Sequence, residues 1–412
     1  MKKHNWIIIG GGAAGLSAAI TLAQKGQSVT LLEQNDRIGK KILASGNGRC
    51  NITNRTISPT HFHADNSDFV ARVLSGYGFE AVSRFFSRLG LPLVEGREGQ
   101  MFPLSLQAGV VVEVLEYAAL DAGVVIETGV RVTGLRKDSR GFILQSEGAR
   151  WEADRVMLAT GSPAAPQLGG SMGGLELAQA LGHTVHPAHP ALVQLESDAP
   201  WLKRTAGVKL EGIVRLYVNG EEMGRRRGDL LFTPYGISGL AILDISHRVG
   251  LALNEGGWCE LKLDLLPRFT KEQLTRLMLD HIDPSSHKPL PLWLHGFLNK
   301  KLVPIVMEQA KCTARNEREL NRKRIGKLVY ALRNFTLPIT DTHGFKHAEV
   351  SLGGVDLGEV DPVTMESRIV PGLYFGGEIL DVVGDRGGYN LHWAWVTGMR
   401  VGDGYWSIVD GG

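Results

Sequence analysis

Cysteine is scarce in this chain, which has 412 residues and only three cysteines, Cys50, Cys259 and Cys312. No two of them form a C-x-x-C pair, and this argues against a dithiol redox centre and against a cysteine-rich zinc site. We therefore expect no bound metal, and a reducing compartment, the cytoplasm, as the location.

Neither sign of charge dominates, because 45 Lys and Arg stand against 43 Asp and Glu and the net charge is +2. Composition thus gives no electrostatic reason for nucleic acid or an anionic membrane as an obligatory partner. We also expect no membrane span, since glycines interrupt the apolar N-terminal run and no later stretch approaches the ~18 apolar residues that a span needs.

Three local clusters stand out from this average. The basic residues of 225–227 and 315–327 are candidates for binding RNA or an acidic substrate. The favoured alternative is that residues 225–227 form a solvated turn and that residues 315–327 form a charged helix face, in which Glu317 and Glu319 are interleaved. The histidines of residues 183–189 stand among prolines without acidic or cysteine neighbours, so a loop is favoured over a zinc site there.

The N-terminus has the pattern of a strand, a glycine turn and a helix. "WIIIG" suits a buried parallel strand, Gly10, Gly12 and Gly15 satisfy G-x-G-x-x-G, and "LSAAITLAQKG" continues as a helix. In this motif the first glycine permits the turn, the second lets backbone N–H groups approach a pyrophosphate, and the third lets helix and strand pack closely. The pattern predicts a dinucleotide site.

A second strand, "SVTLLE", ends at Glu33, 18 residues after Gly15. That is the distance expected for a carboxylate that binds a ribose hydroxyl, and an acid favours an unphosphorylated ribose. Residues 123–161 then read as a meander of short strands that ends in Ala159, Thr160 and Gly161, a pattern typical of flavoproteins.

The C-terminal part supplies a second half to the expected site. Residues 370–381 read as an apolar strand that ends in Gly377 and Glu378. Gly387 and Gly388 then open a turn into an apolar helix, whose first N–H groups favour a negatively charged ligand group. Reduced flavin carries such a charge, and these features together favour FAD over NAD.

The predicted fold is α/β, a FAD Rossmann fold of the two-dinucleotide-binding-domain type that is split by an insertion. The expected parts are a FAD-binding domain in two pieces, a β-rich inserted domain and a helical inserted subdomain that begins with a capping box, Thr270 with Gln273. Their expected bounds are 1–190 and 337–412 for the FAD-binding domain, 191–267 for the β-rich domain and 268–336 for the helical subdomain.

Six motifs in order resemble the BaiN/YhiN-like FAD-dependent flavoproteins, some of which are called aminoacetone oxidase family FAD-binding enzymes. They are "IIIGGGAAGLSAAI", "GKKILASGNGRCNITN", "MFPLSLQA", "LATGS", "GDLLFTPYGISG" and "GLYFGGEILDVVGDRGGYNLHWAWVTG". The chain departs from that family at Pro234 and Leu240, where we expect histidine and proline, so a role of that histidine in substrate binding does not transfer.

The motifs and the resemblance together imply FAD as cofactor. By the resemblance, residues 39–54 lead from the adenosine end past the pyrophosphate to the isoalloxazine ring. The implied cofactor-binding residues are Gly10, Gly12, Ala13, Ala14, Gly15, Glu33, Gln34, Gly39, Lys40, Lys41, Ser45, Gly46, Asn47, Gly48, Val132, Ala159, Thr160, Gly161, Gly377, Glu378, Gly387, Gly388, Tyr389 and Asn390.

Cys50 and Asn51 are the catalytic candidates in this loop. A thiol near the flavin would contact substrate or form an adduct if Arg49 lowered its pKa, whereas a small buried Cys is as often a packing residue, and packing is favoured. Asn51 is either a partner for the flavin or a cap of the turn.

The expected activity is hydride transfer between a small organic substrate, an amine, ketone or enone, and flavin N5, with oxygen or NAD(P)H closing the cycle. The alternative is a binding or regulatory flavoprotein with structural FAD. Only one dinucleotide fingerprint is present, so a dedicated NAD(P)H domain is not expected.

Overall fold

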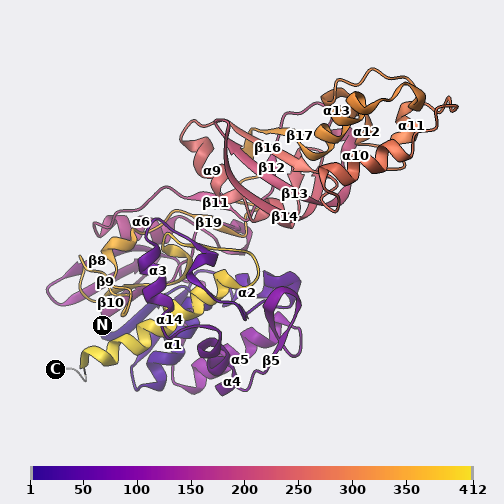
Figure 1. Ribbon diagram of the computed structural model, residues 1–412. Coiled ribbons are helices and arrows are strands. Elements are labelled where there is room, and N and C mark those ends of the chain that lie inside the picture. Colours follow the sequence, from indigo (N-terminus) through magenta and orange to yellow (C-terminus); the bar gives the residue numbers. More distant parts are fainter. Residues whose placement is uncertain (1–2, 410–412) are drawn as a thin grey trace. The chain divides into compact units, whose positions relative to one another are not determined.

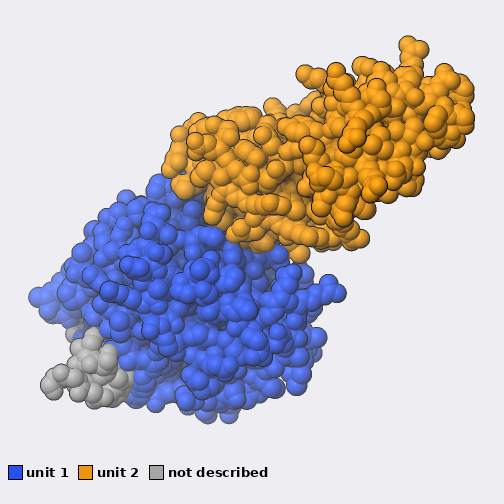
Figure 2. Space-filling model, viewed as in Figure 1, with its two compact units in different colours: residues 1–189, 349–412 blue, residues 190–348 orange. Residues whose placement is uncertain are grey.

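The computed structural model describes residues 3–409, and the chain divides into two compact units. Unit 1 consists of the residues up to 189 and from 349 onward, and unit 2 consists of residues 190–348 (Figures 1 and 2). No helix of residues 3–409 combines the length and the apolar character that crossing a membrane requires.

The main sheet of unit 1 has the strand order β7-β2-β1-β10-β9-β8, and β20 pairs with the end of β10. The neighbours β7, β2, β1, β10 and β20 are parallel, while β8, β9 and the first half of β10 form an antiparallel meander. The strands are β1 (Lys3–Ile9), β2 (Val29–Glu33), β7 (Val125–Thr128), β8 (Val132–Asp138), β9 (Gly141–Ser146), β10 (Ala149–Leu158) and β20 (Leu373–Phe375). The expected Rossmann architecture is confirmed.

The composition of the central strands explains this arrangement. Trp6, Ile7 and Ile8 of β1 are fully buried, and all five residues of β2 are buried. Parallel strands are covered on both faces, which requires such continuous apolar runs. The carboxyl ends of β1, β2, β10 and β20 lie at one edge, because Ile9 is in register with both Leu32 and Leu158.

Two long helices pack together in this unit through small residues. They are α1 (Ala13–Gln24) and α14 (Tyr389–Val409), which lie side by side in Figure 1. A Cβ added to Gly398 would come within 2.1 Å of Ser17 Oγ, and one added to Gly402 within 2.5 Å of Thr21. Only glycine permits this close approach of the two helices.

Shorter elements complete unit 1. Its further helices are α2 (Lys40–Ala44), α3 (Ser67–Leu74), α4 (Phe79–Arg88), α5 (Ala108–Asp121) and α6 (Gly173–Ala180). Its further strands are β3 (Thr53–Asn54), β4 (Phe62–His63), β5 (Leu93–Glu95), β6 (Gln100–Pro103), β19 (Val350–Leu352) and β21 (Val383–Gly384). β3, β6 and β5 form one small sheet, and β21 pairs with β4.

Unit 2 contains an antiparallel sheet with the order β17-β16-β13-β14-β15-β12-β18. The strands are β12 (Leu195–Glu196), β13 (Lys209–Val218), β14 (Glu221–Thr233), β15 (Gly236–Ser238), β16 (Cys259–Asp264), β17 (Phe335–Ile339) and β18 (Asp341–Thr342). Because β17 and β18 follow each other directly in the chain, the sheet begins and ends on one segment, as in a barrel. β11 (His189–Ala191) lies where the chain enters this unit.

The helices of unit 2 share one hydrophobic cluster with its sheet, in which Leu261 and Leu263 are buried together with Leu274 and Leu328. The helices of unit 2 are α7 (Leu202–Thr205), α8 (Leu240–Leu243), α9 (Ser246–Asn254), α10 (Lys271–Asp280), α11 (Leu290–Leu294), α12 (Val303–Gln309) and α13 (Arg322–Arg333). The expected capping box of α10 is present. The unit extends to residue 348 rather than to 336, because β17 pairs with β16 inside the sheet.

Candidate cofactor site

The three motif glycines have three different surroundings. Gly10 has φ +112°, and an added Cβ would lie 2.3 Å from the Ala159 carbonyl oxygen, while a Cβ on Gly15 would lie 1.9 Å from the Gly10 carbonyl oxygen. A Cβ on Gly12 would meet no heavy atom within 4 Å. Gly10 and Gly15 therefore serve the packing of the turn, and Gly12 faces open space of the kind that a pyrophosphate requires.

Glu33 is held rigidly at the end of β2. Its Oε2 accepts a hydrogen bond from the Gly11 N–H (2.7 Å), and its Oε1 accepts from the backbone N–H and the side chain of Asn35 (2.8 and 2.6 Å). A carboxylate offers about four acceptor positions, so about one remains for a ribose hydroxyl. The next residue, Gln34, donates its side-chain amide to the Gly169 carbonyl (2.6 Å).

The two lysines that follow Gly39 have different partners. Gly39 has φ +71°, and α2 begins directly after it. Lys40 Nζ lies 2.8 Å from Asp36 Oδ1, an i,i+4 pair on the surface. Lys41 Nζ lies 2.6 Å from Glu378 Oε2, in the turn η7 (Gly377–Ile379) that follows β20. The structure thus brings together two cofactor candidates that are far apart in sequence, Lys41 and Glu378.

Glu378 has further partners that the sequence did not indicate as site residues. Its Oε1 accepts from the Ser162 hydroxyl (2.7 Å) and from the Ser351 N–H (3.1 Å). A Cβ on Gly377 would lie 3.0 Å from Ala14 Cβ, so this strand end lies against the start of α1. In the sequence, only its position directly after the A-T-G motif could have indicated Ser162 as a site residue.

The loop of the motif "SGNGRCN" has a left-handed backbone. Gly46, Asn47 and Gly48 have φ values of +56°, +56° and +78° in the turn η1 (Ser45–Gly48), and Cys50 has φ +58°. Left-handed angles suit glycine and asparagine but are uncommon for cysteine. The surrounding fold therefore holds Cys50 in place.

The surroundings of Cys50 favour the prediction that it is a packing residue. Its side chain is fully buried in the core of unit 1, and this burial raises the pKa of the thiol to about 12. Arg49 does not counteract the effect, because its guanidinium lies over the ring of Phe102, 4.9 Å from the ring centre. The interpretation of Cys50 as a nucleophile is therefore not supported, since only a thiolate reacts readily.

Two buried polar atoms among the candidate residues have no hydrogen-bond partner in the described part of the chain, Asn51 Oδ1 and Thr160 Oγ1. Leaving such an atom without a partner costs about 1–3 kcal/mol. Asn51 Oδ1 lies beside the turn before α14, since a Cβ on Gly388 would be 2.9 Å from it. A bound ligand would supply the missing partner, so Asn51, Thr160 and the open side of Gly12 fit a dinucleotide such as FAD.

The turn into α14 is fixed by side chains. Gly387 and Gly388 have φ values of +122° and +103°. Asn390 Oδ1 accepts from the Gly384 N–H and its Nδ2 donates to the Gly384 carbonyl (2.7 and 2.8 Å), while the Tyr389 ring stacks on His61. The side chains of Tyr389 and Asn390 thus contact other parts of the protein. The first backbone N–H groups of a helix have no acceptor within the helix, so a ligand group can accept from them here.

Two histidine arrangements near this turn were not predicted. His61 and His63 both bind the carboxylate of Asp385, with N–O distances of 3.1 and 2.7 Å. His392 lies inside α14 between the Thr53 hydroxyl (2.7 Å) and the Tyr77 carbonyl (2.9 Å), and burial lowers its pKa to about 4. His392 is therefore neutral, donates from Nε2 and accepts from Thr53 at Nδ1.

The remaining candidates lie along the same strand ends. Val132 begins β8, and the Val130 N–H donates to the Glu33 carbonyl (2.8 Å). The Ala159 N–H donates to the Ile9 carbonyl (2.9 Å), and Gly161 has φ +73°.

Two of the three histidines of residues 183–189 bind separate acids. His183 contacts Glu359 (2.8 Å) and His186 contacts Asp356 (2.8 Å). Burial lowers the pKa of His183, whereas the hydrogen bond to Asp356 raises that of His186. No group of three or more metal-binding side chains occurs among the described residues.

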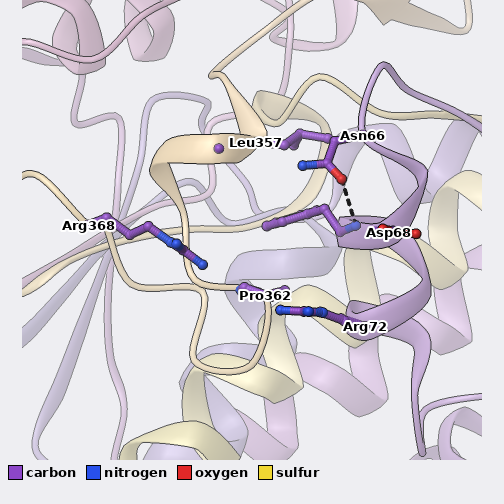
Figure 3. Close-up of a pocket in the computed structure, with 8 residues that line it drawn as sticks. Asn66, Asp68, Arg72, Leu357, Pro362 and Arg368 are labelled. Carbon is purple, nitrogen blue, oxygen red and sulfur yellow. Dashed lines mark hydrogen bonds between the residues drawn. The ribbon is translucent and has the colours of Figure 1, made fainter.

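Figure 3 shows a pocket of about 240 Å³ in unit 1. Its lining contains none of the predicted cofactor residues. Asn66 caps α3 there by accepting the Phe69 N–H (3.0 Å), and Arg72 and Arg368 line the pocket with it. The predicted site residues are thus gathered elsewhere, at the strand ends and the starts of α1 and α14.

The chain is similar to known proteins over most of its length. The HI0933-like protein Rossmann domain matches residues 4–404. The chain is 39% identical over 398 residues to the 3-dehydro-bile acid delta(4,6)-reductase of Clostridium scindens, covering 96% of this chain and 97% of that protein. It is 34% identical over 400 residues to the ribosomal RNA dihydrouridine synthase of Haemophilus influenzae, covering 94% and 95%.

Among solved structures, the 3-ketosteroid delta1-dehydrogenase of Sterolibacterium denitrificans shares the fold, with a TM-score of 0.52 and 12% identity over 98% of this chain and 99% of that one. The chain belongs to the HI0933-like family, which confirms the BaiN/YhiN-like resemblance. It is an FAD-dependent oxidoreductase with a Rossmann FAD-binding fold.

Proposed function

We propose that this oxidoreductase reduces a carbon–carbon double bond conjugated with a carbonyl group in a small organic substrate. The observation that carries the proposal is the 39% identity, over 96% of the chain, to a protein named as a delta(4,6)-reductase of a 3-dehydro-bile acid. Of the expected substrates, an amine, a ketone or an enone, this favours the enone. A cytoplasmic location belongs to the same proposal and rests on the scarcity of cysteine.

When bound, FAD supplies hydride transfer at N5. Glu33 would hold the adenosine ribose through its remaining acceptor position, and the backbone at Gly12 would face the pyrophosphate. The start of α14 would lie toward the ring system, because the positive end of the helix favours the negative charge that reduction brings. Asn51 would donate to or accept from the ring or the substrate.

Reduction of a double bond adds a hydride and a proton, and NAD(P)H is the proposed two-electron donor to the flavin, with the proton coming from solvent. Oxygen, an electron acceptor, would close the cycle only in the opposite direction, in which the substrate is oxidised. The chain has one dinucleotide fingerprint, so the nicotinamide would approach the flavin transiently rather than occupy a domain of its own.

A second candidate substrate is a uracil base in RNA. The observation in its favour is the 34% identity, over 94% of the chain, to a ribosomal RNA dihydrouridine synthase. The C5–C6 double bond of uracil is also conjugated with a carbonyl group, so the same flavin chemistry would reduce it. The two candidate substrates differ in size, but in both the reduced bond is a carbon–carbon double bond conjugated with a carbonyl group.

Anaerobic stopped-flow absorbance on the FAD-loaded protein tests the reaction. We expect NADH or NADPH to reduce the flavin, and a 3-keto-4-ene steroid to reoxidise it without oxygen. The saturated 3-ketosteroid is the matched control and should leave the flavin reduced. The proposal is wrong if the enone and its saturated counterpart behave alike, or if only amines exchange electrons with the flavin. Uridine-containing RNA in a parallel run tests the second candidate.

A further inference from the structure

The positive charge of the chain is concentrated in the helical part of unit 2. Residues 268–333 contain fourteen Lys and Arg and six Asp and Glu, whereas the rest of the chain contains 31 and 37. The near-neutral total therefore conceals a basic segment within an acidic protein. Such a segregation of charge is typical of a surface that binds a polyanion.

The outer face of α13 carries four exposed side chains of this segment. Arg322, Lys323, Lys327 and Tyr330 are exposed, and 65% of Tyr330 is accessible to solvent. On the opposite side of the helix, Ile325, Leu328 and Val329 are among the buried residues of the unit 2 core. We call the four exposed residues the α13 face.

The acids that were expected to neutralise this region do not reach the α13 face. Glu317 is buried in the turn η5 (Glu317–Glu319), where its carboxylate lies 3.5 Å from Lys288 Nζ. Glu319 accepts from the Arg315 N–H and lies 3.9 Å from the Arg324 guanidinium. Within residues 3–409, no ion pair occupies the three cations of the α13 face.

The positions of these cations do not favour helix stability. Arg322 and Lys323 stand in the first turn of α13, which contains no acid, and cations there oppose the helix dipole. Lys323 and Lys327 are an i,i+4 pair of like charge, which is destabilising. The arrangement is therefore better explained by a ligand than by the helix.

We propose that the α13 face is an RNA-binding surface. Arg322, Lys323 and Lys327 contact phosphates, and the Tyr330 ring offers a stacking platform for a base. Unpaired cations beside an exposed aromatic ring match the chemistry of single-stranded or looped RNA. An anionic membrane fits less well, because the apolar residues of α13 are buried and leave no apolar face for insertion. The surface does not depend on the proposed reaction.

Fluorescence anisotropy with a labelled, uridine-containing RNA hairpin tests the surface on the FAD-loaded full-length protein. We expect binding at ~50 mM salt that weakens steeply toward ~200 mM. The triple variant R322Q/K323Q/K327Q should bind at least tenfold more weakly, with a salt slope reduced by roughly 2. Tyr330→Ala should weaken binding without changing the salt slope, because it removes stacking and no charge.

The control is R84Q/R88Q/R97Q, which removes three exposed cations of unit 1 and changes the net charge equally. We expect it to change RNA affinity less than twofold. Equal losses in both triple variants, or no RNA binding at ~50 mM salt, would overturn the proposal. So would tighter binding to phosphatidylglycerol vesicles, or to an acidic peptide, through the same residues. Enone reduction by the α13 triple variant should be unchanged, so failure of the surface and failure of the reaction are distinguishable.

Discussion

Lys41 Nζ and Glu378 Oε2 lie 2.6 Å apart in unit 1, although 337 positions separate the two residues in sequence. The pair joins the start of α2 to the turn η7 that follows β20. Glu378 also binds Ser162 and Ser351, so one carboxylate connects four segments of the FAD-binding fold.

Glu378→Ala should destabilise the flavin-free protein by about 1–3 kcal/mol, because Lys41, the Ser162 hydroxyl and the Ser351 N–H lose their partner together. Urea unfolding followed by tryptophan fluorescence measures the change. Glu80→Ala on the exposed side of α4 is the control, and it should cost no more than about 0.5 kcal/mol. Equal losses in the two variants would show that the Glu378 contacts contribute little.

Gly12→Val should fold and fail to bind FAD. The added side chain points into the open space beside the turn, where the structure has no heavy atom within 4 Å of the new Cβ. Gly109→Val near the start of α5, where an added Cβ is also free of neighbours, is the control and should bind FAD normally. Flavin content after gel filtration checks both. Gly15→Ala should instead prevent folding, since its Cβ would lie 1.9 Å from the Gly10 carbonyl.

Cys50→Ser should retain FAD and change turnover less than tenfold, about 1.4 kcal/mol in the barrier. The buried thiol, whose pKa is raised to about 12, should also resist alkylation by iodoacetamide. Cys312 is partly exposed and should react first, which makes it an internal control for peptide mass spectrometry. An inactive Cys50→Ser protein with full flavin content would show that the thiol takes part in the chemistry.

Asn51→Leu should separate binding from stability. Because Asn51 Oδ1 is buried without a partner, leucine should leave the flavin-free protein at least as stable as the wild type. FAD or substrate should bind more weakly by about 1–3 kcal/mol, since a polar group of the ligand loses its partner. Thermal unfolding without flavin and titration with FAD give the two values. A loss of stability with unchanged affinity would assign Asn51 to the turn alone.

The buried His392 should make the protein acid-sensitive. Burial lowers its pKa to about 4 in the folded state, from about 6.5 when unfolded, so the unfolded chain binds the proton more readily. Stability is unaffected above about pH 6.5 and falls as the pH is lowered toward about 4, by about 2 kcal/mol at pH ~5. In the His392→Gln variant this position cannot be protonated. The difference between wild type and variant in the free energy of unfolding, measured with urea, should therefore shrink by about 2 kcal/mol between neutral pH and pH ~5. A pH-independent difference would contradict the assignment.

Several features follow from the sequence by itself because they depend on neighbouring residues. The strand, glycine turn and helix at residues 3–24 and the position of Glu33 rest on local spacing, and so does the capping box of Thr270 with Gln273. The meander of β8, β9 and β10 rests on alternation and turn residues. Backbone propensity, periodicity and fixed motif spacing decide such elements before any tertiary contact forms.

Other features were decided only by the tertiary structure. Which residue pairs with Lys41 depends on which distant segments meet in the fold. The same is true of the burial of Cys50 and of the buried position of Glu317, away from the charged face of α13. The same holds for the end of unit 2, where β17 pairs with β16, a strand that lies far earlier in the chain. Burial, ion pairing and pKa depend on the surroundings of a side chain, and distant segments supply those surroundings only when the chain has folded.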